Sequence, residues 1–444
     1  MGPLNTMASA AAASTSSPSS TTRSHWHFAV IALLVIWGPL YRALFDKGWM
    51  LLGGLPLVGQ WAQLQNLAEL VSAPAFAGVG LGLTVLTAQR PQHEHPSLFF
   101  SAALLGWVST APLLAAVLIW PTPMGQWLGL DPSLHSWLVW IALSGWAGIL
   151  FGQLSSYWLG QQRHARVLAL SVTTGLPALL ALLIASHNAA HGDPQQGLQH
   201  VVWTGLLVSG AGLLALLAAL YRWMKQTPHA RAQLHTAFKK VAVYLPAGFS
   251  IGLLTPLSAM AIRSSLAQQI DWQAAGTATA LWRASDWILS SASAFLYYHY
   301  LPKLSLWAQA GQLRQQLPQV MRRMVLPCGT LLLVLWLLQT SVLPLLYDER
   351  LQASPAVTAT LWGGDLLRIV AAVFLYALFA LHASKTIAWG EWLSQPLLAL
   401  LLAMGAAQSL MFTGLAHMGT YALYATVNAL AVAWHLRQVG RHPG

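Results

Sequence analysis

The chain has very few charged residues. Asp, Glu, Lys and Arg make up 7% of its 444 residues, far below the roughly 25% that is typical of soluble domains. Hydrophobic residues make up 56%, and the mean hydropathy is +0.56. This composition excludes an ordinary soluble domain and predicts a polytopic membrane protein.

Cysteine is almost absent as well. The single Cys328 lies inside an apolar run and excludes an intramolecular disulfide and a thiolate metal cluster. No Walker lysine motif is present, so the chain does not itself hydrolyse ATP. Gly78, Gly80 and Gly82 follow no strand and lie in an apolar run, which favours close helix packing over nucleotide binding. No cofactor and no metal site is predicted.

Acidic residues are scarce, with 11 Asp and Glu against 22 Lys and Arg and a formal net charge of +11. The basic residues do not form one tract, as a nucleic-acid-binding surface would require, so no nucleic-acid partner is predicted. They recur in alternate short connectors, including those with Arg90, Arg163, Arg222 and Lys303. This is the positive-inside pattern. It predicts a multi-pass membrane protein with both termini in the cytoplasm.

Apolar stretches make up most of the sequence between the connectors. Each is about 20 residues long, the length that crosses some 30 Å of hydrocarbon. Twelve such stretches begin near His27, Val58, Leu98, Ser136, Arg166, Gln199, Lys240, Ala275, Met324, Ala356, Ile387 and Leu410. The predicted fold class is therefore an all-α polytopic membrane protein with about twelve transmembrane helices.

The longest basic connector separates six of these stretches from the other six, which predicts two six-helix lobes around a central cavity with substrate bound between them. The polar first segment has too little apolar surface to order itself. The predicted boundaries are a disordered cytoplasmic tail at 1–25, an N-terminal lobe at 26–221, a cytoplasmic linker at 222–238, a C-terminal lobe at 239–436 and a cytoplasmic tail at 437–444.

Ionisable residues inside the apolar stretches are the candidate binding residues, because charge at membrane depth is costly and is kept where it faces water, a partner or a substrate. The candidates are Arg42, Glu69, Arg283, Asp286, Asp365, Arg368, Lys385 and Glu391. Arg283 with Asp286 and Asp365 with Arg368 have i, i+3 spacing, which predicts that each pair neutralises itself on one helix face. Structural ion pairs that only fix helix packing remain the alternative.

With Arg263, which ends the seventh apolar stretch, these positions include five basic and four acidic residues. This slight excess favours an anionic ligand, since Arg and Lys bind phosphate oxygens well. Most of the 22 tryptophans lie near the ends of the stretches, as in an interfacial belt. Four lie deeper or beside the charged pairs and are either sugar-stacking residues or packing residues. They are Trp146, Trp282, Trp287 and Trp362.

One stretch resembles a known family. Its matching residues are Gly364, Asp365, Leu367, Arg368, Ala371, Val373, Phe374, Tyr376, Ala380, Lys385, Glu391, Ser394 and Gln395. With Asp286 placed before the run Tyr300-Leu301-Pro302-Lys303-Leu304-Ser305, the pattern resembles the Wzx-type lipid-linked oligosaccharide flippases. These include lipid III (enterobacterial common antigen) and O-antigen flippases and belong to the multidrug/oligosaccharidyl-lipid/polysaccharide (MOP) exporter superfamily.

The resemblance implies a transporter of the bacterial inner membrane rather than an enzyme. It implies translocation of an undecaprenyl-pyrophosphate-linked oligosaccharide from the cytoplasmic to the periplasmic leaflet by alternating access. It further implies membrane lipid, a polysaccharide polymerase and a chain-length regulator as partners. A polar head group needs a hydrated passage because hydroxyls and phosphates are costly to bury in hydrocarbon.

Two alternatives remain open from the sequence. A MATE-like cation or drug antiporter would call for unpaired carboxylates, whereas the carboxylates in the second half have basic neighbours. An integral-membrane glycan polymerase or ligase would call for a large periplasmic loop, whereas the connectors assigned to that side are short.

Overall fold

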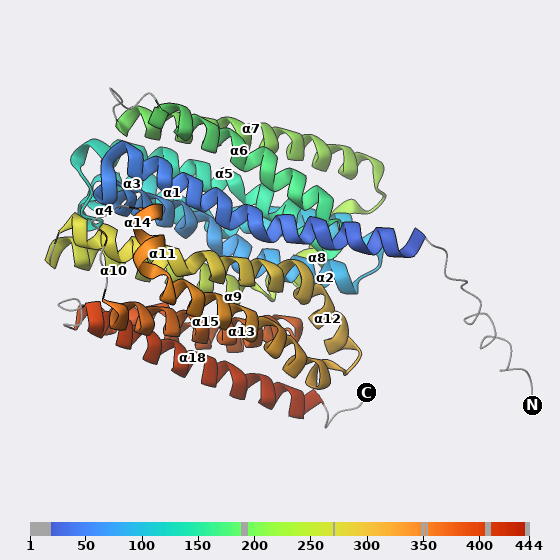
Figure 1. Cartoon of the computed structure of the whole chain (residues 1–444). Helices are drawn as coiled ribbons and strands as arrows, with labels where there is room; N and C mark the ends of the chain where they lie inside the picture. The colour runs from blue at the N-terminus through green and yellow to red at the C-terminus, as the bar shows by residue number, and fades with distance from the viewer. Residues whose placement is uncertain are drawn as a thin grey trace, which may run out of the picture.

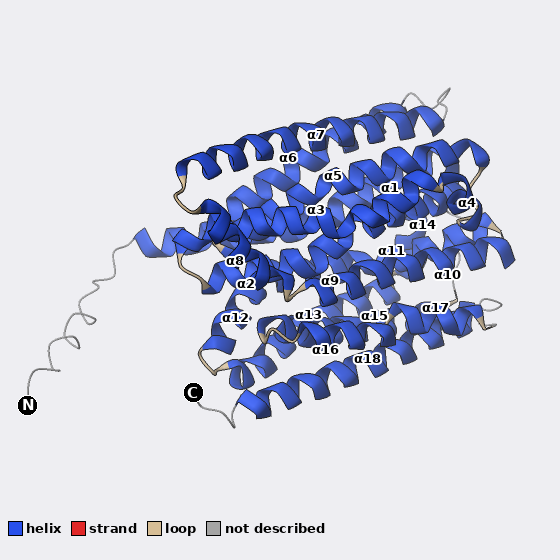
Figure 2. Cartoon of the chain, turned by 180° about the vertical axis from the view of Figure 1, so that it is seen from behind, coloured by secondary structure: helices blue, strands red, loops and turns tan. Residues whose placement is uncertain are grey.

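A computed structural model describes residues 19–187, 194–269, 271–347, 351, 354–404 and 410–439. Within these ranges the regular structure is helical and contains no strand (Figure 2). Helices satisfy their own backbone hydrogen bonds, which is what an apolar chain needs in hydrocarbon. Residues 1–18 of the expected first tail and 440–444 of the second lie outside the described residues.

The N-terminal lobe contains six long helical segments. They are α1 (Ser19–Pro74), which supplies two of them and continues through η1 (Ala75–Gly80) and α2 (Leu81–Gln89), and α3 (His95–Ile119), α5 (His135–Gly160), α6 (His164–His187) and α7 (Pro194–Gln226). The helical path of α1 is interrupted at Gly53 and Gly54, and Gly54 has φ 69°. That positive φ suits glycine, so one continuous apolar range contains two spans.

The C-terminal lobe repeats this number of segments. They are α9 (Leu245–Phe249) with η5 (Ser250–Leu254) and α10 (Thr255–Gln269); α11 (Trp272–Phe295) with η6 (Leu296–Tyr300) and α12 (Leu301–Gln309); α13 (Leu313–Leu337); α15 (Pro355–Ala380); α16 (Ser384–Gly390) with η7 (Glu391–Leu393) and α17 (Gln395–Ala403); and α18 (Leu410–Val439). The predicted two-lobed, all-helical fold with about twelve spans is confirmed among the described residues.

Eight helical ranges of the described chain are long and apolar enough to cross a membrane, and the first of these, 29–89, includes the break at Gly53 and Gly54. Large apolar side chains such as Leu331, Leu337 and Leu430 lie exposed on the outer helices, where lipid can cover them. The chain is a multi-pass membrane protein.

Short elements complete the connectors. They are η2 (Gln92–Glu94), α4 (Pro121–Trp127), η3 (Pro132–Leu134), α8 (Ala230–Ala242) and α14 (Gln339–Leu346). The expected linker, 222–238, coincides with the end of α7 and most of α8. Helix α8 packs on α3, where Ser101 Oγ donates to the Leu234 carbonyl at 2.9 Å, and Lys240 of α8 pairs with Glu94 of the preceding turn η2 at 2.6 Å.

The two lobes lie side by side, with α1 and α11 in contact between them (Figure 1). Helices α5, α6 and α7 lie on one side of this contact and α13, α15 and α18 on the other. The first residues of α1 and the last of α18 lie at the same end of the bundle. This arrangement places the middle of α1 and α11 at the centre of the molecule.

Glycines bring the lobes together on one side of that centre. A Cβ on Gly78 would lie 2.3 Å from Gly248 Cα, and one on Gly82 would lie 2.3 Å from the Tyr244 ring. The Tyr244 hydroxyl in turn hydrogen-bonds His382 Nδ1. Partial burial and the nearby Arg90 lower the pKa of His382 below its usual value. The interpretation of the glycine run as a close-packing motif is confirmed.

Corresponding spans of the two lobes share an unusual element order. The second span passes from α1 through the π-helix η1 to α2, and the eighth passes from α11 through the π-helix η6 to α12. A further π-helix, η5, lies between Pro246 and Pro256, the proline pair of the seventh span. π-helical turns are rare and often lie at functional sites.

Candidate functional site

A cavity of about 740 Å³ lies where the two lobes meet. It is lined by residues of α1, α5, α6 and α7 from the first lobe and of η5, α10, α11, α15, η7, α17 and α18 from the second. Its charged lining residues are Arg42, Asp46, Glu69, Arg263, Arg283, Asp286, Arg368 and Glu391. Four of these are basic and four acidic, so the lining is rich in charge and balanced in sign.

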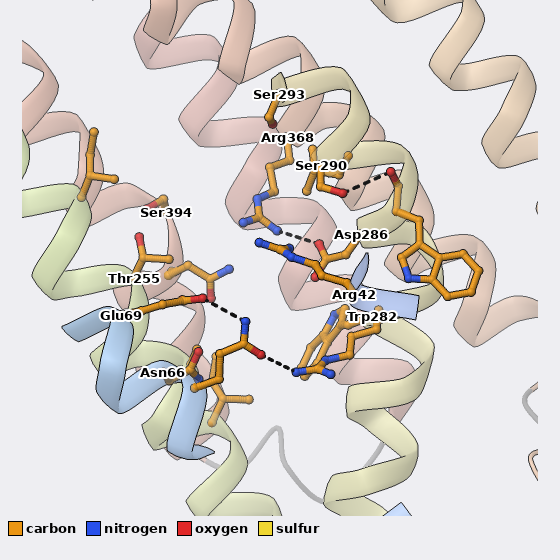
Figure 3. A pocket seen from close by; sticks show the side chains of 18 of the residues that line it. Arg42, Asn66, Glu69, Thr255, Trp282, Asp286, Ser290, Ser293, Arg368 and Ser394 are labelled. Carbon is orange, nitrogen blue, oxygen red and sulfur yellow. Dashed lines mark hydrogen bonds and ion pairs between the residues drawn. The ribbon is translucent and has the colours of Figure 1, made fainter. Parts of the chain in front are cut away.

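Arg283 of α11 connects the lobes. Its guanidinium forms an ion pair with Asp46 of α1, and the two side chains are only 14% and 4% exposed. Arg283 Nη2 also donates to Gln65 Oε1 at 3.0 Å, and Gln65 Nε2 donates to Glu69 Oε1 at 3.3 Å (Figure 3). Four polar side chains from two helices therefore form one continuous network of an ion pair and hydrogen bonds across the interface between the lobes.

Arg368 of α15 forms the second ion pair of the cavity. Its Nη1 lies 3.5 Å from Asp286 Oδ1 of α11, and about a third of each side chain remains exposed (Figure 3). The guanidinium also lies over the Tyr421 ring, 5.5 Å from its centroid, in a favourable cation–π arrangement. Both residues belong to the C-terminal lobe, and their exposed atoms can contact a ligand in the cavity.

Asp365 lies behind the cavity wall rather than in it. Its carboxylate accepts from Ser285 Oγ at 2.5 Å and lies 3.0 Å from His417 Nε2. His417 lines the cavity. Asp365 therefore orients a cavity residue without reaching the cavity itself.

Glu391 enters the cavity from the 3-10 turn η7. Its carboxylate accepts from the Tyr424 hydroxyl and from Ser394 Oγ, the latter at 3.1 Å. Beside it, Gln395 Nε2 donates to the Tyr421 hydroxyl at 2.8 Å. The break between α16 and α17 thus places a buried carboxylate and two polar side chains at membrane depth, as interrupted helices commonly do at transport sites.

Arg42 differs from the other arginines. It lines the cavity and is exposed there, and its side chain points into the space between Glu69 and Asp286 (Figure 3). Asp46, one helical turn further along α1, forms its ion pair with Arg283 and not with Arg42. Arg42 is therefore the cation most accessible to a ligand.

The expected pairing within single helices is wrong. Arg283 pairs with Asp46 rather than Asp286, while Arg368 pairs with Asp286 rather than Asp365. An i, i+3 spacing makes contact available, but partners on neighbouring helices compete for the same charge, and packing between helices decides the outcome.

Some candidates lie away from the cavity. Lys385 is exposed near the start of α16 and does not line it. Trp146 and Trp362 also lie outside the lining and donate to the carbonyls of Trp107 and Leu281 at 3.4 and 3.2 Å. For these two residues the packing interpretation fits the contacts. Trp282 and Trp287 do line the cavity.

Sequence reasoning missed Asp46 and His417 as cavity residues and left Arg263 out of the candidate binding residues. Asp46 is followed by Lys47 and is not among the candidates, yet its i, i+4 spacing from Arg42 places both on one face. Arg263 was assigned to a helix end, whereas it lines the cavity and donates from Nε to Thr279 Oγ1 at 3.2 Å. His417 gave no distinguishing sequence signal.

The fold and the cavity together define a two-lobed multi-pass membrane protein with the fold of the MATE transporters. A point mutant of the Vibrio cholerae MATE transporter VcmN has a TM-score of 0.70 at 15% identity, over 95% of this chain and 98% of that one. A multidrug resistance MATE family transporter of the MOP superfamily, in an outward-facing conformation, has 0.68 at 10% identity, over 93% and 95%.

A MOP superfamily transporter from Pyrococcus furiosus, described as having a binding pocket of reverse polarity, has a TM-score of 0.66 at 11% identity, over 92% of this chain and 93% of that one. No protein-family model and no curated protein sequence matches the chain. At these identities the likeness shows the fold.

Proposed function

We propose that the chain is a membrane transporter that carries a polar solute through the central cavity by alternating access. The observation that carries this proposal is the cavity itself, which lies between two lobes and is lined by charged residues from both. Its volume of about 740 Å³ falls within the roughly 300–1,000 Å³ of small-molecule sites. The transporter fold supports this class over a glycan polymerase or ligase.

The solute we propose is the head group of an undecaprenyl-pyrophosphate-linked oligosaccharide, moved from the cytoplasmic to the periplasmic leaflet. Arg42 and Arg368 both face the cavity, and guanidinium groups bind phosphate oxygens through paired hydrogen bonds. Arg283 is less suited to this role because Asp46 already neutralises it. The polyprenyl tail stays in lipid throughout.

Polar groups around the arginines suit the sugars. Asn66, Thr255, Ser290, Ser293 and Gln395 line the same cavity and offer hydroxyl and amide groups. Trp282 and Trp287 add aromatic faces on which sugar rings can stack. The resemblance of residues 364–395 to the Wzx-type flippases supports the same substrate class.

The test is to neutralise the two accessible arginines. We expect Arg42→Gln and Arg368→Gln each to lower translocation of a fluorescent undecaprenyl-pyrophosphate oligosaccharide in proteoliposomes at least tenfold, since each lost charge-assisted hydrogen bond contributes about 1.5–3 kcal/mol. Lys385→Gln, which removes an exposed charge outside the cavity, is the matched control. Wild-type translocation by both arginine variants would overturn the proposal.

A MATE-like cation antiporter is the second candidate. It is favoured by the fold and by the carboxylates of Glu69 and Glu391 in the cavity lining. In this case Glu391→Gln would abolish efflux of a cationic dye while Arg42→Gln would not. Dye efflux and oligosaccharide translocation measured on the same variants separate the two functions.

A further inference from the structure

A second, smaller cavity lies on the outer side of the C-terminal lobe. Its volume is about 380 Å³, and its walls come from α13, α15 and α18, which lie together at one edge of the molecule (Figure 1). The lining includes Arg314, Met321, Phe374, Ala433, Leu436 and Arg437. It is separate from the central cavity, which shares none of its residues.

Both charged residues of this groove lie at the same end. Arg314 is the second residue of α13 and Arg437 is in the last turn of α18, and these helices run in opposite directions. Neither helix contains an Asp or Glu. Both arginines are exposed, so the groove ends in two cations that no acidic residue of α13 or α18 offsets.

The remainder of the groove is apolar and continues into the membrane. Met321 lies seven residues beyond Arg314, and Ala429 lies eight residues before Arg437. At a rise of 1.5 Å per residue, the apolar part extends about 10–12 Å from the charged end. Leu430 and Trp434, on the neighbouring face of α18, are 66% and 54% exposed and continue this apolar surface outward.

An apolar groove with two cations at its end complements an amphiphile that has a long alkyl chain and an anionic head. We propose that it is a binding site for an anionic phospholipid of the surrounding bilayer, with the phosphate between Arg314 and Arg437 and an acyl chain along Met321 and Phe374. Basic pockets between membrane helices bind anionic lipid heads in this way. The proposal does not depend on which solute the central cavity carries.

Lipid binding to the purified full-length protein tests the proposal. Native mass spectrometry would compare phosphatidylglycerol with phosphatidylcholine of the same acyl chains. We expect phosphatidylglycerol to bind more tightly, and the double variant Arg314→Gln/Arg437→Gln to weaken its binding at least tenfold, since both cations at the phosphate end are removed. The matched control is Arg322→Gln/Arg323→Gln, which removes two exposed charges of α13 that lie outside the groove.

A steric variant tests the apolar part independently. Ala433→Trp fills the groove and should reduce phosphatidylglycerol binding, whereas Leu430→Trp places the same ring on the exposed face of α18 and should not. Equal binding of the two lipids by the wild-type protein, equal losses in both double variants, or a clear preference for undecaprenyl phosphate over phosphatidylglycerol would each overturn the proposal. Melting temperatures confirm that the variants are folded, and if Ala433→Trp fails to fold the arginine variants decide.

Discussion

At the scale of single residues, the two ion pairs of the cavity differ in burial. The Arg283–Asp46 pair joins the lobes and is nearly buried, whereas the Arg368–Asp286 pair lies within one lobe and is about a third exposed. Removing one partner of a buried pair leaves an uncompensated charge, while an exposed pair contributes little. The two pairs should therefore differ sharply in their effect on stability.

We expect Arg283→Gln to destabilise the folded protein by about 3–5 kcal/mol, because Asp46 is left buried without its cation. Asp286→Asn should cost no more than about 1 kcal/mol, since its pair is partly exposed. Unfolding in detergent micelles measures both. The double variant Asp46→Asn/Arg283→Gln should recover part of the loss, and equal losses in the two single variants would contradict this ranking.

The positions of the charges along the chain could be predicted from the sequence, but their partners could not. Six of the candidates lie deep in apolar stretches and line the cavity: Arg42, Glu69, Arg283, Asp286, Arg368 and Glu391. Depth follows from distance along a helix. Partners follow from how helices rotate against one another, and that rotation is set by packing between distant parts of the chain rather than by the sequence of one helix.

At the scale of elements, span positions were predictable because an apolar run of fixed length is a strong signal. The stretches expected near Ala356 and Leu410 begin at Pro355 and Leu410. The largest difference is at α13, which begins at Leu313 rather than near Met324. Its first three turns carry Arg314, Arg322 and Arg323. These charges lower the local hydropathy, so the apolar stretch begins later in the sequence than the amphipathic helix does.

At the scale of elements, η1 and α9 pack closely through two glycines, and a single substitution tests this contact. A Cβ on Gly78 would lie 2.3 Å from Gly248 Cα, and backbone cannot yield as a flexible side chain can. We expect Gly78→Ala to separate the lobes there and to cost about 1–3 kcal/mol of stability, the usual range for overpacking. Thermal unfolding in detergent measures the cost.

Gly148→Ala is the matched control for this substitution. Gly148 lies in α5, and a Cβ there would meet nothing within 4 Å. This variant should be as stable as the wild-type protein or slightly more so, because alanine favours helix over glycine. Equal melting temperatures for Gly78→Ala and Gly148→Ala would show that the glycine contact is not tight.

At the scale of the whole molecule, two lobes with the same number of spans enclose a charged cavity. The order helix, π-helix, helix recurs in the second and eighth spans, although the sequences of the two halves show no clear identity. Such correspondence is what internally repeated transporter folds show. The proposed cytoplasmic location of both termini then fixes which connectors face the periplasm.

Reporter fusions test this orientation. An alkaline phosphatase reporter joined after Asp131 should be active, because that connector is expected in the periplasm, and one joined after Thr227 should be inactive. Green fluorescent protein at the same two positions should give the opposite pattern. Activity of the phosphatase after Thr227 would invert the assignment of every connector.

The lone sulfhydryl has a practical consequence. Cys328 is buried in the middle of α13, and thiol reagents act on the thiolate, which forms where water can reach. A maleimide dye supplied in buffer should therefore leave the native chain unlabelled. Any cysteine introduced at the mouth of the cavity would then report its own accessibility, so that opening and closing could be followed without first rebuilding the protein.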